Sequence, residues 1–242
     1  MATTQEIKIK YSDVECNLFL KPYALLNYLQ DIASDDAEKL GFGYSFIHPK
    51  NLAWFLIKYR MEFIEYPKDV QNITLKTQSR GYNKLFAYRD FEFYSNEKLI
   101  ARIQSVWTLV DITTRSLTQM ASVFDGNDNI SLFEKKEDDL VFEKIKTIQN
   151  PVTTKEFQVR FNDLDVNGHT NNGNYIIWAF ETLDFDFHEK HSLKTLDMQF
   201  KKETKYNDRI ISQLEIIDNK TTLHRLSNEN NEDLCLIQCS WN

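Results

Sequence analysis

The segment of residues 163–181 gathers acidic, amide and imidazole side chains directly before an apolar run. Asp165, Asn167 and His169 occupy alternate positions in it, so an extended backbone would place their side chains on one face. Such groups can aim a water molecule at a carbonyl carbon, accept its proton and donate a hydrogen bond to the oxygen that becomes negative. The segment is therefore predicted to form the centre of a hydrolytic site.

A second copy of this pattern lies earlier in the chain, at residues 13–31. Two shorter blocks repeat in the same order: residues 61–68 match 198–205, and residues 103–107 match 237–241. Repeats of this kind indicate two copies of one small domain. The pairs that matter are Asp13 with Asp163, Glu15 with Asp165, Asn17 with Asn167, Phe19 with His169 and Tyr66 with Glu203. The second copy is predicted to carry the chemistry, since the first has lost both His and Glu.

A helix is expected to begin near Asn171 or Asn172. Its first backbone N–H groups would point at the same place and could hold a developing oxyanion. Both Asn residues suit helix capping, with substrate contact as a second role, and Asp163 suits a cap or turn. Glu203, at the end of a strand in the same half, is expected to approach from the other side.

Hydrophobic periodicity predicts the same plan in each half: one long helix followed by an antiparallel meander that packs on it. This α+β arrangement is a tandem of two hot-dog domains, each a long helix wrapped by a curved antiparallel sheet. We assign residues 1–112 to a non-catalytic, acyl-binding first domain, 113–150 to a connection and 151–242 to a catalytic second domain. The expected helices are 22–40 and 172–189, and the expected strands are 52–66, 71–81, 84–95, 98–111, 155–161, 194–203, 209–217, 221–227 and 233–241.

Composition limits the class of protein. With 242 residues, 42% of them apolar, the chain can bury two cores, and a net charge of −7 argues against a nucleic-acid binder. No apolar stretch approaches the roughly 20 residues that cross a bilayer, and the first residues are not typical of a signal peptide, so a cytoplasmic protein without membrane association is expected. Three cysteines without framework spacing favour a reducing compartment. No metal and no cofactor are assigned.

Beyond these patterns, the run Asp-Leu-Asp-Val-Asn-Gly-His-Thr-Asn-Asn, with Phe-Lys-Lys-Glu downstream, resembles the second half of the acyl-acyl carrier protein thioesterases. The stretches Leu-Leu-Asn-Tyr-Leu-Gln-Asp-Ile-Ala and Leu-Phe-Ala-Tyr-Arg-Asp-Phe-Glu are similar to the family's first repeat. The resemblance implies that Asp165, Asn167, His169 and Glu203 are catalytic. Plant members have a Cys directly after that Glu; Thr204 stands there in this chain, so a covalent route through Cys is not expected.

These residues suggest hydrolysis of a fatty acyl thioester, in which Glu203 acts as general base on water and His169 positions that water or shares the proton. Direct attack by the carboxylate through an anhydride stays open as an alternative. So do a thioesterase for coenzyme A thioesters and a non-catalytic acyl-binding module.

Two binding surfaces are also expected. The helix–sheet interface of the first half is the candidate slot for the acyl chain. Its candidate lining residues are Leu25, Leu29, Trp54, Leu56 and Phe86. A local basic cluster, Lys201, Lys202, Lys205 and Arg209, could receive the acidic acyl carrier protein, although a solvated strand face explains it as well. The chain could be a monomer or a homodimer.

Overall fold

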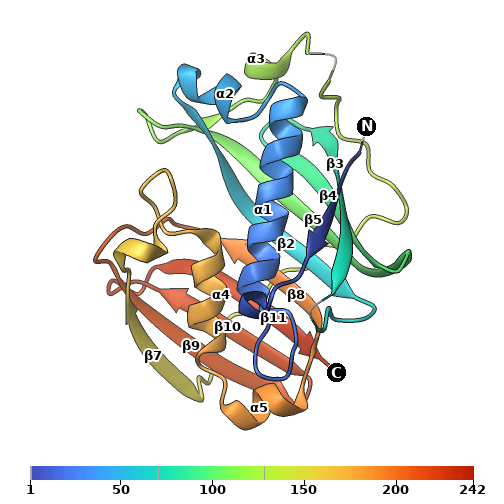
Figure 1. The fold of residues 1–242 in the computed structure, drawn as a ribbon. Helices are drawn as coiled ribbons and strands as arrows, with labels where there is room; N and C mark the ends of the chain where they lie inside the picture. Colours follow the sequence, from blue (N-terminus) through green and yellow to red (C-terminus); the bar gives the residue numbers. More distant parts are fainter. Residues whose placement is uncertain (1, 70, 128) are drawn as a thin grey trace.

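Figure 1 shows the computed structural model of the protein, which describes residues 2–69, 71–127 and 129–242. The first half contains β1 (Thr3–Lys8), α1 (Pro22–Lys39), α2 (Tyr44–Ile47), β2 (Leu52–Phe63), β3 (Asn72–Tyr82), β4 (Ala87–Ser95), β5 (Lys98–Asp111), β6 (Leu117–Thr118) and α3 (Ala121–Phe124). The second half contains β7 (Thr153–Gln158), α4 (Asn172–Phe180), α5 (Phe185–Lys190), β8 (Leu193–Phe200), β9 (Arg209–Asp218), β10 (Thr221–Ser227) and β11 (Asp233–Trp241).

The strands form one continuous antiparallel sheet across both halves. Its order is β1-β3-β4-β5-β2-β8-β11-β10-β9-β7, with β6 paired to β5. The order of the second half is the reverse of the first, as a pseudo-twofold axis between β2 and β8 requires. At that joint Arg60 lies opposite Asp197, and its guanidinium Nη1 is 2.5 Å from the carboxylate. The halves are therefore joined through backbone pairing as well as through side chains.

Local geometry repeats where the sequence repeats. Phe19 bridges to Lys68 in the first half, as His169 bridges to Lys205 in the second. The residues that precede Phe19 and His169 both have a left-handed backbone: φ is +65° at Leu18 and +74° at Gly168. These correspondences agree with the residue pairs that the sequence alignment predicts.

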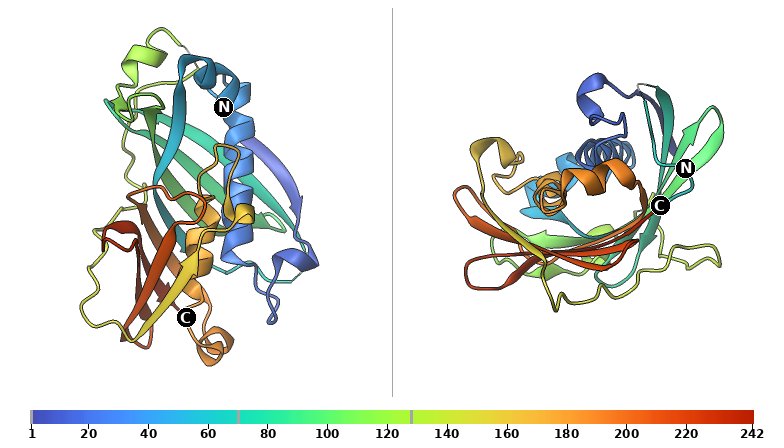
Figure 2. Two further views of the ribbon diagram at one scale, coloured as in Figure 1. Left: turned by 90° about the vertical axis from the view of Figure 1, so that its left-hand side faces the viewer. Right: turned by 90° about the horizontal axis from the view of Figure 1, so that it is seen from below.

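Helices α1 and α4 lie side by side within the concave face of the sheet (Figure 2). In α1, Leu25, Leu29 and Ile32 recur at helical spacing and are fully buried. They belong to a single core cluster that also contains Tyr175 and Trp178 of α4. The two helices thus share one core, whereas the sequence predicts a separate core for each half.

Three further details differ from the predicted elements. Strand β1 was not expected, although it matches β7 in both position and pairing. The predicted helix at residues 172–189 is two helices, because the Asp184 side chain accepts a hydrogen bond from the Phe187 N–H (2.7 Å) and starts α5. Part of the predicted connection packs on the first half: Met120, Phe124 and Ile130 are buried beside Phe42. The domain boundaries at residues 112 and 150 stay a prediction.

In the described part of the chain, no helix has both the length and the apolar character needed to cross a membrane.

Candidate active site

A tight turn carries the residues predicted to be catalytic in the second half. The Gly168 N–H donates to the Asp165 carbonyl (3.0 Å), and the Asp165 N–H donates to the His169 carbonyl (2.7 Å). The Asp165 carboxylate accepts from the N–H groups of Asn167 (2.8 Å) and His169 (3.2 Å). The expected extended segment is thus wrong: this carboxylate binds its own backbone, and the turn rather than alternation orients the side chains.

His169 and Glu203 lie together. The Thr170 N–H donates to the Thr204 carbonyl (2.9 Å), so the chain around His169 pairs with the chain just beyond β8. His169 Nδ1 is 3.3 Å from Glu203 Oε1, and the side chains are 15% and 33% exposed. Glu203 therefore contacts the imidazole and remains accessible to water.

Arg115 reaches the same carboxylate from the first half. It lies in the turn after β5 with φ +56°, and its Nη1 donates to Glu203 Oε2 at 3.2 Å. Glu203 Oε1 thus faces His169 of the second half, and Oε2 faces Arg115 of the first half. Sequence reasoning missed Arg115, because nothing near it in the chain indicates that its side chain would meet Glu203.

The pKa of Glu203 is raised above its ordinary value. Burial is the largest cause, and the Asp165 carboxylate adds to it. His169, Arg115 and Lys205 act in the opposite direction by favouring the charged carboxylate. A carboxylate with a raised pKa is a stronger base while it is still ionised, as general-base catalysis requires.

Thr204, which directly follows Glu203, is 2% exposed. Its hydroxyl is 2.7 Å from that of Thr170 and 3.1 Å from that of Tyr175. This side chain points into the core and holds the two segments together. It is not placed to act as a nucleophile.

Backbone N–H groups at the start of α4 already have hydrogen-bond partners within the chain. The Asn171 side chain caps the helix by accepting from the Gly173 N–H (2.8 Å), and the Asn174 N–H donates to the Asn171 carbonyl (2.9 Å). A β-carbon at Gly173 would lie 2.7 Å from the Tyr23 ring of α1, so this helix end packs tightly on its neighbour. The capping role of Asn171 is confirmed. Half-buried Asn172 opens the helix, and two of the N–H groups expected for an oxyanion are already bonded.

The corresponding turn in the first half keeps the geometry without the chemistry. The Glu15 carboxylate accepts from the N–H groups of Asn17 and Phe19, both at 2.9 Å. Phe19 then packs edge-on against Tyr66, with ring centroids 6.1 Å apart. Two aromatic rings thus occupy the positions that His169 and Glu203 hold in the second half.

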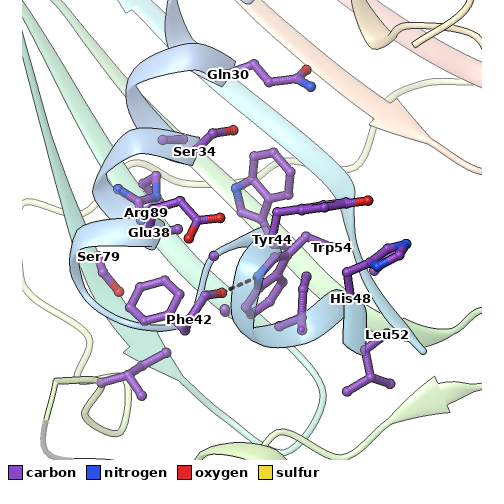
Figure 3. A pocket seen from close by; sticks show the side chains of 18 of the residues that line it. Gln30, Ser34, Glu38, Phe42, Tyr44, His48, Leu52, Trp54, Ser79 and Arg89 are labelled. Carbon is purple, nitrogen blue, oxygen red and sulfur yellow. Dashed lines mark hydrogen bonds between the residues drawn. The ribbon is translucent and has the colours of Figure 1, made fainter. Parts of the chain in front are cut away.

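A cavity of about 290 Å³ opens in the first half, beside the turn of the second half that carries His169 (Figure 3). Val166 and Asn167 of the turn contribute to its wall, so the cavity reaches the segment that carries His169. The remaining lining residues come mainly from α1, α2 and the first half of the sheet. They include Gln30, Ala33, Ser34, Ala37, Glu38, Phe42, Tyr44, Leu52, Trp54, Ser79, Arg89 and Trp107.

Of the predicted acyl-chain residues, Trp54 lines this cavity. Leu25, Leu29 and Leu56 are instead buried in the common core. Phe86 is half-buried outside the lining. The reason is the register of α1: residues 25, 29 and 32 face the core shared with α4, whereas residues 30, 33, 34, 37 and 38 face the cavity.

The predicted basic cluster is largely neutralised by neighbouring acids. Lys202 lies 2.5 Å from Glu232, and Lys201 lies 3.5 Å from Asp233. Arg209 contacts Glu156 at 2.6 Å and Glu229 at 3.3 Å. Among the described residues, only the ammonium group of Lys205 within this cluster forms no ion pair. Three of the four residues lie in the segment between β8 and β9 rather than on a strand, so the expected strand face is wrong, and most of the cluster is a solvated, ion-paired surface.

Comparison with known proteins agrees with this geometry. Residues 1–124 match the family model described as the acyl-ACP thioesterase N-terminal domain, and residues 146–242 match that of the acyl-ACP thioesterase C-terminal domain. The chain belongs to the acyl-ACP thioesterase family. The two matches also follow the two halves of the sheet in order.

Curated relatives in the family include a chloroplastic oleoyl-acyl carrier protein thioesterase of Coriandrum sativum, 24% identical over 202 residues. A chloroplastic palmitoyl-acyl carrier protein thioesterase of Gossypium hirsutum is 25% identical over 235 residues. The matches cover 76% and 90% of this chain, but 54% and 56% of those relatives. The chain thus spans about half the length of the curated relatives it matches.

Solved structures share the whole fold. A putative oleoyl thioesterase from Lactobacillus plantarum superposes with a TM-score of 0.90 at 23% identity, over 100% of this chain and 96% of that one. A 12:0-ACP thioesterase from Umbellularia californica gives a TM-score of 0.87 at 18% identity, over 100% and 97%. The tandem hot-dog fold predicted from the sequence is confirmed.

Proposed function

We propose that this protein hydrolyses the thioester of fatty acyl-acyl carrier protein and releases the free fatty acid and the carrier. The observation that carries the proposal is the contact between His169 and Glu203. His169 lies on the turn whose Asn167 lines a cavity large enough for part of an acyl chain. The acyl chain would occupy this cavity in the first half. Its thioester would then lie at the turn in the second half.

In the proposed reaction, the Glu203 carboxylate accepts a proton from a water molecule as the water oxygen attacks the thioester carbon. His169, 3.3 Å from that carboxylate, orients the water or shares the proton. Collapse of the tetrahedral intermediate breaks the carbon–sulfur bond, and the proton passes to the leaving thiolate. The overall reaction converts one thioester and one water molecule into one fatty acid and one thiol.

Three further residues fit supporting roles. The Asn167 side chain, on the cavity wall, is the candidate donor to the carbonyl oxygen as it becomes negative. Asp165 is bonded to the N–H groups of Asn167 and His169, so its proposed role is to hold the turn in place. Asn171 supports the same turn by capping α4.

Attack by the Glu203 carboxylate itself would form an anhydride. A single turnover in water labelled with heavy oxygen tests for this route, because water that opens the anhydride at the Glu203 carbonyl leaves label in that carboxylate. With water attack, the label appears in the fatty acid and none is found in Glu203. Label in the Glu203 carboxylate after one turnover would contradict general-base hydrolysis.

Carrier-linked and coenzyme A-linked thioesters of the same acyl chain should be compared side by side. We expect a higher kcat/KM with the carrier-linked substrate. We also expect Lys205→Gln to raise KM severalfold for that substrate, because Lys205 is the cluster residue that forms no ion pair with the described residues. Added salt should raise KM in the same way. Lys220→Gln, in the turn between β9 and β10, is the control. Equal or better hydrolysis of the coenzyme A thioester would favour the alternative function.

Arg115→Ala should shift the acid limb of the kcat/KM profile to higher pH. Glu203 must be ionised to act as base, and the guanidinium favours the ionised form, so its removal raises the pKa further. On the acid limb we expect a loss of up to about fivefold, in the range for an exposed ion pair.

The conservative Arg115→Lys variant keeps the charge and should restore the position of the limb. Arg102→Ala, which removes an arginine from the other end of β5, serves as the matched control. An unchanged limb in Arg115→Ala would show that the contact with Glu203 has no role in the reaction.

We also propose a cytoplasmic location. The described structure contains Cys16, Cys235 and Cys239 as free thiols, which supports a reducing compartment such as the cytoplasm. The β2–β8 joint supplies within one chain the pairing that hot-dog domains otherwise obtain by association. A monomer or a homodimer is compatible with it.

A further inference from the structure

The cavity beside the active-site turn has two unlike walls. Figure 3 shows Tyr44, His48, Leu52 and Trp54 on one side, and Ser34, Phe42, Ser79 and Arg89 on the other, so the guanidinium and both serine hydroxyls share one side. The apolar side continues into stacked rings: Trp54 lies parallel to Phe124, with centroids 5.7 Å apart. An unsubstituted acyl chain would need the first wall only.

Arg89 is the unusual member of the polar wall. The residue is 5% exposed, and its Nη1 donates to Asp36 (2.6 Å) and Thr77 (3.1 Å). Its Nε and Nη2 have no hydrogen-bond partner among the described residues, and neither is a fully enclosed atom. Arg89 lines the cavity, and these two groups are the part of its guanidinium that is not committed to the protein.

Two hydroxyl groups accompany the guanidinium. Ser79 lies directly opposite Arg89 in the β3–β4 register, and both line the cavity. Ser34 faces the same space from α1. Within the described residues, neither hydroxyl forms a hydrogen bond to the protein. Three side chains from α1, β3 and β4 thus present unused hydrogen-bonding groups to one space.

We propose that the cavity recognises an acyl chain that carries a neutral oxygen, as a hydroxyl or oxo group, bound by Arg89, Ser79 and Ser34. This inference rests on the proposed thioesterase function. A saturated chain would cover these donors without replacing their hydrogen bonds to water, which is unfavourable. A chain oxygen would satisfy them. Sites built to bind a substrate oxygen discriminate strongly against analogues that lack it.

The electrostatics of the wall favour a neutral oxygen over a carboxylate. Asp36 already balances the charge of Arg89 at 2.6 Å. Glu38 lines the same side of the cavity, and its carboxylate accepts from the Ser45 N–H (2.9 Å). A carboxylate on the chain would therefore meet an excess of negative charge. Hydroxyl and oxo groups accept the same hydrogen bonds without that repulsion.

The test compares carrier-linked acyl chains of equal length with and without oxygen, placed beside the thioester, in mid-chain or at the far end. For at least one position, wild-type kcat/KM is expected to exceed that for the saturated chain by about tenfold, as one hydrogen bond to a charged donor allows. Ser79→Ala with Ser34→Ala should reduce this ratio severalfold, because the oxygenated chain loses its partners and the saturated chain no longer covers hydroxyls without replacing their hydrogen bonds. Ser95→Ala, at the far end of β4, should leave the ratio unchanged.

Arg89→Lys removes the guanidinium but leaves buried Asp36 with a positively charged partner. It should also lower the ratio of kcat/KM between the oxygenated and the saturated chain. A wild-type protein that hydrolyses saturated chains as well as every oxygenated one would overturn the inference and leave the proposed function standing. So would a ratio that none of the three substitutions alters. Absence of hydrolysis with every acyl thioester would instead contradict the proposed function itself.

Discussion

Glu203→Gln is expected to lower kcat/KM by about 100- to 10,000-fold, the range for losing a general base. The amide keeps the size of the side chain but cannot accept the proton of the attacking water. His169→Ala should give a loss of similar order, since it removes the group 3.3 Å from that carboxylate. Initial rates with a carrier-linked acyl chain measure both effects.

Folding should be nearly unaffected in both variants, because Glu203 is one-third exposed and the segment is held by the Thr170–Thr204 contacts. Thermal unfolding checks this point. Glu229→Gln, an exposed glutamate that contacts Arg209, is the matched control and should retain full activity. Wild-type rates in both Glu203→Gln and His169→Ala would show that the reaction takes place elsewhere.

Ala33→Phe is expected to abolish most hydrolysis of long acyl chains while sparing short ones. Ala33 lines the cavity of about 290 Å³, and a phenyl ring there would occupy space needed by the end of a long chain. Each buried methylene is worth about 0.8 kcal/mol, so excluding three of them should lower kcat/KM on the order of 50-fold. A series of carrier-linked saturated chains of increasing length would show where the loss begins.

Trp54→Ala should move the preference in the opposite direction, because the indole, which stacks on Phe124, forms part of the cavity wall and its removal enlarges the space. Ala121→Phe, at an exposed position of α3, is the control for adding a ring outside the cavity. An unchanged chain-length profile in both Ala33→Phe and Trp54→Ala would show that the acyl chain binds at another surface.

Most of the fold follows from hydrophobic periodicity and the internal repeat. The bounds of β5, β10 and β11 agree with the predicted strands, and α1 ends one residue before the predicted end. Strand β1 was missed because its exposed side chains give little alternation. The break between α4 and α5 depends on a cap at Asp184, a local signal that an apolar run obscures. The continuous sheet depends on β2 meeting β8, a long-range pairing that local patterns cannot indicate.

The candidate site was predictable only in part. Comparison of the two copies singled out His169 and Glu203, which the structure brings together. It did not reveal Arg115, whose approach to Glu203 depends on a left-handed turn in the other half. The acyl-chain residues were chosen by apolar character alone. That criterion favours core positions such as Leu25 over the small and polar residues that leave a cavity open.

The β2–β8 joint has a consequence for how such a protein can change. In an assembly of two identical subunits, every substitution appears twice, so a residue that improves binding at one face must be tolerated at the other. Here a single polypeptide supplies both partners of the joint, and each side can diverge by itself. Phe19 and Tyr66 can then place aromatic rings at one of the two equivalent positions while the other position carries an imidazole and a carboxylate.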